Sequence, residues 1–223
     1  ARRKGVWLAP HGKTPLSPQL CQLQLAAGAW GLTFANVHQA RVGVAAGAQR
    51  LIIANQVLAH ADLNALDALL TAQPGLRVWF LVDSLAQLAL IEAWQRDSGR
   101  PRVFDVLLEV GMAGQRTGCR TAAEAQQIAQ RIHASPVLAL AGIECYEGTT
   151  ATCNHAQDRA TVQQLMDRVE AMAREVIAQG WFAHEEIILS AGGSAIFDLV
   201  AERLTPDLGR PVRGVLRSGC YLT

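Results

Sequence analysis

Lysine is rare in this sequence, and one of its two lysines stands where an amine could act as a nucleophile. Lys4 and Lys13 are the two lysines among twenty lysine and arginine residues. Lys4 belongs to the basic run 2–4, which is typical of a solvated surface charge. Lys13 follows the apolar stretch 6–9 and a Pro-His-Gly break, so we expect it at the edge of a core. Partial burial there would favour the neutral amine of a Schiff-base nucleophile, although a surface lysine in a loop suits the same position.

A second group of residues could bind an anion. The glycine loop, residues 190–194, reads Ser-Ala-Gly-Gly-Ser, and its paired glycines allow backbone N–H groups to approach an anion closely. A plain tight turn, with Ser194 capping the next helix, is the alternative. A reactive lysine combined with a phosphate loop indicates a phosphorylated aldehyde or ketone: pyridoxal phosphate, or a sugar phosphate in an aldolase.

Strand and helix patterns alternate along the chain, and both groups of residues fall at strand ends. Apolar runs bounded by turn residues predict eight strands, over 6–9, 31–35, 51–54, 78–82, 103–108, 137–143, 187–189 and 212–216. Apolar stripes and capping residues predict seven helices between them, over 17–28, 38–46, 63–70, 84–97, 121–134, 162–177 and 196–204. Ser84 and Thr121 each begin a predicted capping box with the residue three positions later.

This alternation predicts a single domain of class α/β. Strands that alternate with helices pair in parallel, and their number and the chain length favour a (β/α)8 barrel of the TIM type. The continuous apolar strands agree, because strands buried on both faces lose their two-residue alternation. A doubly wound open sheet is the alternative, but no G-x-G-x-x-G follows the first strand.

The carboxyl ends of the strands in such a barrel line one mouth, where chemistry takes place in this fold. Polar residues concentrate at these ends, while the strand bodies stay apolar. We expect at this mouth His11, Lys13, Asn55, Gln56, Asp83, Glu109, Arg116, Tyr146, the glycine loop and residues 217–221. Asp83 could serve a structural turn, and Glu109 and Arg116 could pair with each other.

Composition argues against several other classes of protein. The net charge of +1 arises from interspersed basic and acidic residues, without the basic stripe that nucleic-acid binding requires. The apolar runs are too short to span a membrane. Five dispersed cysteines without a C-x-x-C pair suit a reducing cytoplasm better than a disulfide framework. No histidine or cysteine pair has zinc-site spacing, so we expect no metal held by this chain alone.

Six short motifs occur in an order that resembles a known family. They are His-Gly-Lys-Thr at 11–14, Ala-Asn-Gln at 54–56, Glu-Val-Gly at 109–111 with Arg-Thr-Gly at 116–118, Tyr-Glu-Gly at 146–148, the glycine loop, and Arg-Ser-Gly-Cys-Tyr at 217–221. As a set they resemble the alanine-racemase-like, fold type III pyridoxal phosphate enzymes. Within this family the chain is most similar to the D-serine dehydratase and D-threonine aldolase group, and especially to bacterial amino acid deaminases.

The resemblance implies roles for residues at the mouth. Lys13 would form the Schiff base with pyridoxal 5′-phosphate and exchange the substrate's Cα proton. His11 would lie beside the cofactor ring, Gln56 and Tyr146 would line it, and Arg116 would face its phenolic oxygen. Gly192, Gly193 and Ser194 would hold the phosphate with Tyr221 nearby. Ser190, Arg217 and Gly219 complete the implied cofactor-binding set.

The resemblance also implies parts that lie outside this sequence. Enzymes of this group carry a β-rich C-terminal domain that contributes a metal site and completes the active site across a homodimer. We therefore expect residues 1–223 to be a single barrel domain without that C-terminal domain. A divalent metal such as zinc would be bound only through the additional domain.

The leading functional hypothesis is a lyase that eliminates water and ammonia from a β-hydroxy D-amino acid such as D-serine. Retro-aldol cleavage of D-threonine, or racemisation, uses the same cofactor contacts and is the first alternative. A non-catalytic single-domain pyridoxal phosphate carrier is the second alternative, and a cofactor-free Schiff-base aldolase is the third.

Overall fold

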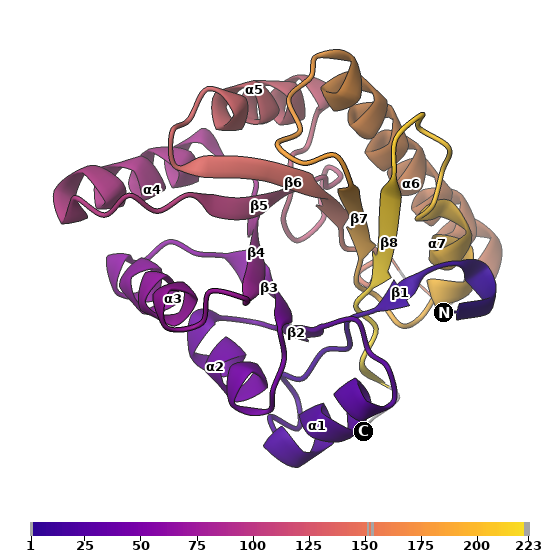
Figure 1. The fold of residues 1–223 in the computed structure, drawn as a ribbon. Coiled ribbons are helices and arrows are strands. Elements are labelled where there is room, and N and C mark those ends of the chain that lie inside the picture. Colours follow the sequence, from indigo (N-terminus) through magenta and orange to yellow (C-terminus); the bar gives the residue numbers. More distant parts are fainter. Residues whose placement is uncertain (1, 151, 153, 221–223) are drawn as a thin grey trace.

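The strands of the computed structural model, which describes residues 2–150, 152 and 154–220, form one parallel sheet. Their bounds are β1 Trp7–Leu8, β2 Leu32–Phe34, β3 Arg50–Gln56, β4 Arg77–Val82, β5 Phe104–Glu109, β6 Leu138–Cys145, β7 Ile187–Ala191 and β8 Val212–Leu216. Their order in the sheet is β1-β8-β7-β6-β5-β4-β3-β2, so the first strand of the chain lies beside the last. Figure 1 shows this meeting as the indigo β1 next to the yellow β8.

Backbone hydrogen bonds between the β1 and β2 segments bring the two edges of the sheet together. Trp30 donates its amide to the carbonyl of Leu8 at 2.8 Å, and Gly12 donates to Thr33 at 2.8 Å. His11 also forms a parallel bridge with Thr33. These contacts close the sheet into a barrel, which confirms the predicted (β/α)8 fold and excludes the open, doubly wound alternative.

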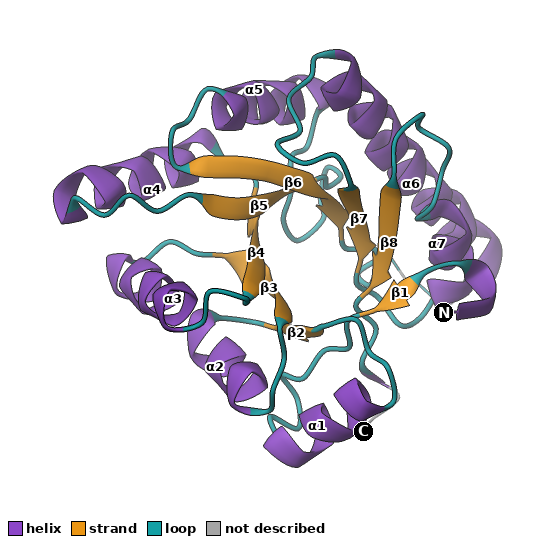
Figure 2. Ribbon diagram, viewed as in Figure 1, coloured by secondary structure: helices purple, strands orange, loops and turns teal. Residues whose placement is uncertain are grey.

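The helices lie on the outside of the strands (Figure 2). Their bounds are α1 Pro18–Ala26, α2 Val37–Ala45, α3 His60–Ala72, α4 Leu85–Ser98, α5 Ala122–His133, α6 His155–Ala178 and α7 Phe197–Arg203, with a 3-10 turn at Arg2–Lys4. Each α-helix connects two consecutive strands, as parallel pairing requires. All eight predicted strands and all seven predicted helices are therefore present among the described residues.

One of the two predicted capping boxes forms only in part. The capping box at Thr121 and Glu124 is complete, with both reciprocal hydrogen bonds formed. At α4 the Ser84 hydroxyl does accept from the amide of Gln87, but the Gln87 side chain accepts from Asp83 instead of Ser84. The predicted box at Ser84 is therefore wrong in its second half, because Gln87 also donates to the Leu81 carbonyl and is drawn toward β4.

The apolar side chains form two separate cores. The larger core lies between the strands and the surrounding helices. The smaller one lies inside the barrel and includes Trp30, Ile52, Trp79, Leu107 and Ile188. Because one face of each strand meets the helices and the other meets the barrel interior, both faces are apolar over the strand bodies. The polar residues of the barrel therefore lie mainly at the ends of the strands.

Candidate active site

Residues at the carboxyl end of β1 bring a histidine and a lysine to one mouth of the barrel. His11 is partly buried, whereas Lys13 is exposed. The prediction that Lys13 stands sheltered at the edge of a core is wrong, because the turn after Gly12 carries it out into the mouth. Gly12 itself is packed on the ring of Phe34, where an added Cβ would lie 2.7 Å from a ring carbon.

The imidazole of His11 lies in a strongly cationic environment. Burial and, to a lesser extent, the charges of Arg217, Lys13 and Arg116 together lower its pKa to about 3. Its Nδ1 atom is buried and has no hydrogen-bond partner among the described residues. His11 is therefore neutral near pH 7, and its Nδ1 is free to bind a ligand group at the mouth.

A layer of polar residues crosses the top of the barrel on three neighbouring strands. Glu109 of β5 is in register with Glu144 of β6, which is in register with Ser190 of β7. Arg217, directly after β8, reaches into this layer although it is only 2% exposed. Its Nη1 donates to the Ser190 hydroxyl at 2.7 Å, and its Nη2 lies 2.5 Å from Glu144 Oε2.

The carboxyl groups of this layer titrate at unusually high pH. Burial raises the pKa of Glu144 to about 8, although Arg217 opposes the shift. Burial also raises the pKa of Glu109, and Asp83 adds to this shift. Carboxyl groups with raised pKa values beside a buried cation are typical of functional sites.

Glu109 joins the β3 end to the loop after β5. It accepts a hydrogen bond from Gln56 Nε2 at 2.6 Å and another from the Thr117 hydroxyl. Asp83 accepts from the Gly118 amide at 3.0 Å, which agrees with its expected structural role. The expected pair of Glu109 with Arg116 is not the arrangement found here.

Arg116 contacts an aromatic ring instead. Its guanidinium carbon lies 4.1 Å from the centre of the Tyr146 ring. An added Cβ on Gly192 would lie 3.2 Å from the same ring. Tyr146 therefore lies between a cation from the β5 loop and the glycine loop after β7.

The glycine loop binds an anion, and that anion is a side chain of this protein. The amides of Gly192 and Gly193 donate to the two carboxylate oxygens of Glu147 at 3.2 and 2.6 Å. Burial raises the pKa of Glu147, while the two amides oppose that shift. A Cβ on Gly193 would overlap Glu147 Oε1, so a glycine is required for this close approach.

The remaining predicted residues differ in their positions. Gly219 lies against His11, since a Cβ on it would lie 2.8 Å from the His11 backbone nitrogen. Ser194 is partly buried, and its hydroxyl has no hydrogen-bond partner in the described part of the chain. It does not cap the next helix, because the N-cap of α7 is Ile196. Tyr221 lies outside the described residues.

Sequence reasoning did not select Glu144 and Glu147 as site residues. Both are glutamates in or just after an otherwise apolar strand, and both are at most 1% exposed. An acidic residue at the end of a buried strand was the available indication. Ser218, expected at this mouth as part of residues 217–221, fixes the glycine loop by donating to the Gly193 carbonyl at 2.6 Å.

No group of three or more histidine, cysteine, aspartate or glutamate residues that could hold a metal ion occurs among the described residues. Over the same part of the chain, no helix combines the length and the apolar character needed to cross a membrane.

The sequence matches a known family over most of its length. Residues 13–211 match the family described as alanine racemase, N-terminal domain. The chain is 30% identical to the D-threonine aldolase of an Arthrobacter species over 198 residues, which are 89% of this chain and 51% of that protein. It is 33% identical to the D-threo-3-hydroxyaspartate dehydratase of a Delftia species over 115 residues, which are 52% of this chain and 29% of that protein.

The fold is also that of a solved enzyme. The crystal structure of D-threonine aldolase from Filomicrobium marinum matches with a TM-score of 0.80 at 25% identity, over 99% of this chain and 56% of that one. The match thus spans about half the length of the Arthrobacter enzyme and of the solved structure.

Proposed function

Because the chain belongs to the alanine racemase N-terminal domain family, whose enzymes use pyridoxal 5′-phosphate, we propose that it forms the cofactor-binding barrel of a lyase acting on a β-hydroxy D-amino acid. The two curated relatives are named for D-threonine and D-threo-3-hydroxyaspartate. Both substrates are D-amino acids with a hydroxyl group on Cβ. The single observation that carries the proposal is the meeting of Lys13, the neutral His11 and the glycine loop at one mouth.

The residues at this mouth fit pyridoxal phosphate. The buried Nδ1 of His11 lacks a hydrogen-bond partner among the described residues. Buried polar atoms normally have such a partner, and a cofactor placed against His11 would supply one. The amides of Gly192 and Gly193 already hold a carboxylate, which supports their ability to bind an anion. A phosphate would either displace Glu147 from these amides or use the adjoining hydroxyl of Ser194.

Each residue of the mouth has a proposed task. Lys13 would hold the cofactor covalently through its amine and, once released, take or return the proton at the substrate's Cα. His11 would lie beside the cofactor ring as a neutral group, because its pKa of about 3 prevents it from carrying a charge near pH 7. Arg116, supported on Tyr146, would place its cation against the phenolic oxygen of the cofactor.

Other residues would line the cofactor or hold the lining residues in place. Gln56 would line the ring together with Tyr146, held in place by its 2.6 Å hydrogen bond to Glu109. Ser190 and Arg217 would hold each other inside the barrel, and Gly219 would allow its segment to approach His11. The Tyr221 side chain would complete the phosphate site.

When bound, the cofactor withdraws electrons from the substrate's Cα, and the protein decides which bond is broken by orienting the substrate. Elimination of the β-hydroxyl and retro-aldol cleavage both begin from a β-hydroxy amino acid. The dehydratase reaction, with D-serine as the representative substrate, is our first assignment. The aldolase reaction is the second candidate, because the relative that covers most of the chain is a D-threonine aldolase.

We further propose that residues 1–223 constitute one barrel domain and that the functional enzyme is a cytoplasmic homodimer. The closed strand order supports a single domain. Three buried cysteines without disulfide bonds, Cys21, Cys119 and Cys145, support a reducing compartment.

The test is a product assay on the protein loaded with pyridoxal phosphate. D-serine should yield pyruvate and ammonia, and L-serine should yield neither. If D-threonine instead yields glycine and acetaldehyde while D-serine is inert, the aldolase is the correct assignment. Bound cofactor without turnover of either D-amino acid would contradict both assignments and favour the non-catalytic carrier.

A further inference from the structure

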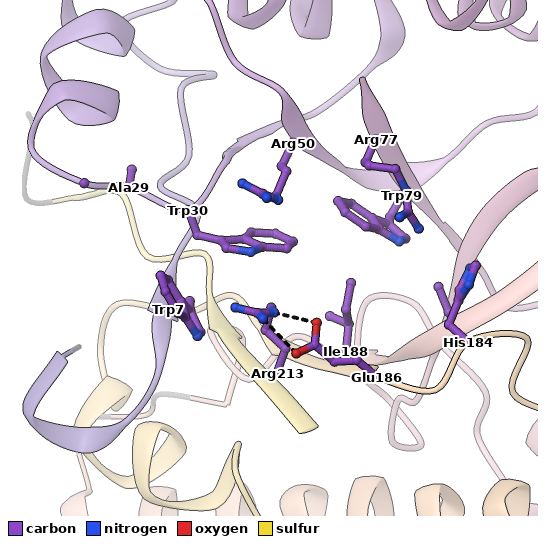
Figure 3. A pocket seen from close by; sticks show the side chains of 12 residues that line it. Trp7, Ala29, Trp30, Arg50, Arg77, Trp79, His184, Glu186, Ile188 and Arg213 are labelled. Carbon is purple, nitrogen blue, oxygen red and sulfur yellow. Dashed lines mark hydrogen bonds and ion pairs between the residues drawn. The ribbon is translucent and has the colours of Figure 1, made fainter. Parts of the chain in front are cut away.

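A cavity of about 610 Å³ opens at the opposite end of the barrel from the proposed active site. Its walls come from the amino ends of the strands: Trp7 begins β1, while Arg50 and Arg77 begin β3 and β4. Arg213 of β8 and Glu186, just before β7, complete the rim. Figure 3 shows these side chains gathered around the opening.

Two stacked indole rings form the inner wall of the cavity. The rings of Trp30 and Trp79 lie 5.3 Å apart with an angle of 25° between their planes. Both belong to the apolar core inside the barrel. Trp30 is 9% and Trp79 is 4% exposed, so they form a largely buried aromatic wall that borders the cavity.

Three arginines surround these rings, each lying over a tryptophan. Arg50 lies 5.7 Å from the ring centre of Trp30, Arg77 lies 5.2 Å from that of Trp79, and Arg213 lies 4.9 Å from that of Trp7. Because guanidinium groups lying over aromatic rings keep their donors free at the edge, such pairs can both stack on a ligand and bind its charge.

The positive charge at this end is not fully balanced. Arg213 pairs with Glu186 at 2.7 Å, and Arg77 pairs with Asp105 at 2.7 Å. Asp105 is shared with His184, 2.6 Å away. Arg50 has no carboxylate partner within the described ranges, so the rim retains an unpaired cation.

A buried donor supplies an independent indication of a ligand. Trp79 is only 4% exposed, and its Nε1–H has no acceptor in the part of the chain that the structure describes. In Figure 3 the nitrogen edge of this ring is turned toward the space beside His184 and Ile188. Buried indole N–H groups normally have an acceptor, and this one lacks it in the wall of a cavity.

We propose that this cavity is a second binding site, distinct from the pyridoxal phosphate site, for a planar aromatic anion. The ring of the ligand lies against Trp30 and Trp79, its carboxylate or phosphate binds Arg50, and an acceptor atom on it receives the Trp79 N–H. The cavity volume falls within the range of small-molecule sites, roughly 300–1,000 Å³. An aromatic carboxylate and a nucleoside monophosphate share this chemistry.

Calorimetric titration of the chain with two probes tests the site and distinguishes the two sources. The probes are 1-naphthoate and adenosine monophosphate, with 1-naphthamide as the uncharged ring and acetate and inorganic phosphate as anions without a ring. We expect at least one aromatic anion to bind with one-to-one stoichiometry, at least tenfold more tightly than 1-naphthamide and than the matching ringless anion. Absence of saturable binding by both aromatic anions, or equal binding of 1-naphthamide, would overturn the proposal.

Variants locate the bound probe. Arg50→Gln, at an exposed position, should weaken binding at least tenfold, and Trp79→Phe, which keeps a ring but removes the N–H, should weaken it severalfold. Arg41→Gln on the outer face of α2 is the matched control and should bind as the parent does. If Arg50→Gln retains the parent's affinity, the anion binds elsewhere and the proposal is wrong; this test remains valid if Trp79→Phe fails to fold.

Discussion

At the scale of single residues, His11 and Glu144 have strongly shifted pKa values at the proposed active site. The two shifts predict opposite effects of pH on the free energy of unfolding. His11 has its pKa lowered to about 3 by burial and by three nearby cations. Glu144 has its pKa raised to about 8 by burial. Each shift is a difference between the folded and unfolded chains, so each makes the free energy of unfolding depend on pH.

His11 should destabilise the protein in acid. Below its ordinary pKa of 6.5 the unfolded chain binds a proton at this imidazole, whereas the folded chain does not until about pH 3. The unfolding free energy therefore falls as the pH decreases from 6.5 toward 3, by up to about 1.4 kcal/mol per pH unit from this group. In urea denaturation at pH 7.5 and 4.5, His11→Gln should lose less stability than the parent. Equal losses would contradict this environment of His11.

Glu144 should destabilise the protein as the pH rises, whereas His11 does so as the pH falls. Between its ordinary pKa of 4.5 and about 8, the folded chain retains a proton that the unfolded chain releases. The contribution of Glu144 to the free energy of unfolding is fully present below pH 4.5. It is lost as the pH rises to 8, again by up to about 1.4 kcal/mol per pH unit. Glu144→Gln should therefore gain stability relative to the parent between pH 5 and 8. A constant difference between the two proteins over this range would show that Glu144 is not buried as described.

Residue types at strand ends could be predicted, but their contacts could not. Lys13, His11 and Arg116 were selected because polar residues follow apolar strands. Glu144 was missed because only the register of β6 against β5 and β7 reveals its place in the polar layer. Glu147 was missed because its partners are amides of the glycine loop, which is distant in the sequence. The exposure of Lys13 was predicted wrongly because it depends on the turn after Gly12.

At the scale of elements, the glycine loop depends on a carboxylate from another strand end. Gly193→Ala would place a methyl group 2.8 Å from Glu147 Cδ and in overlap with Glu147 Oε1. We expect it to displace the loop and weaken pyridoxal phosphate binding by roughly tenfold, about 1.4 kcal/mol, the order of one charge-assisted hydrogen bond. Titration followed by visible absorbance measures the affinity.

Gly75→Ala is the matched control for this loop variant. A Cβ on Gly75 meets no atom within 4 Å, so cofactor affinity should equal that of the parent. If Gly193→Ala also binds as tightly as the parent, the amides of the glycine loop do not hold the phosphate.

Helices and strands could be predicted because their apolar residues recur with different periods along the sequence. Continuous apolar runs marked strands such as β4, and the stripe along α6 marked a helix. The capping box at Thr121 was confirmed, whereas that at Ser84 formed only in part. The difference arises from a tertiary contact, the hydrogen bond from Gln87 to the Leu81 carbonyl, which local sequence does not encode.

At the scale of the whole molecule, the barrel has two chemically different mouths. One mouth collects Lys13, His11 and the glycine loop, and the other collects arginines and tryptophans around a cavity. The barrel could be predicted from the number and order of strands. The second mouth could not, because its residues lie at the amino ends of strands that are far apart in the sequence.

The central claim is that Lys13 binds pyridoxal phosphate covalently, and borohydride reduction followed by peptide mass spectrometry tests it most directly. After incubation with the cofactor and reduction, the adduct should be found on the peptide that contains Lys13. It should persist in Lys4→Ala, whose side chain pairs with Glu202 on the surface, and disappear in Lys13→Ala. An adduct on Lys4, or one that survives in Lys13→Ala, would contradict the account.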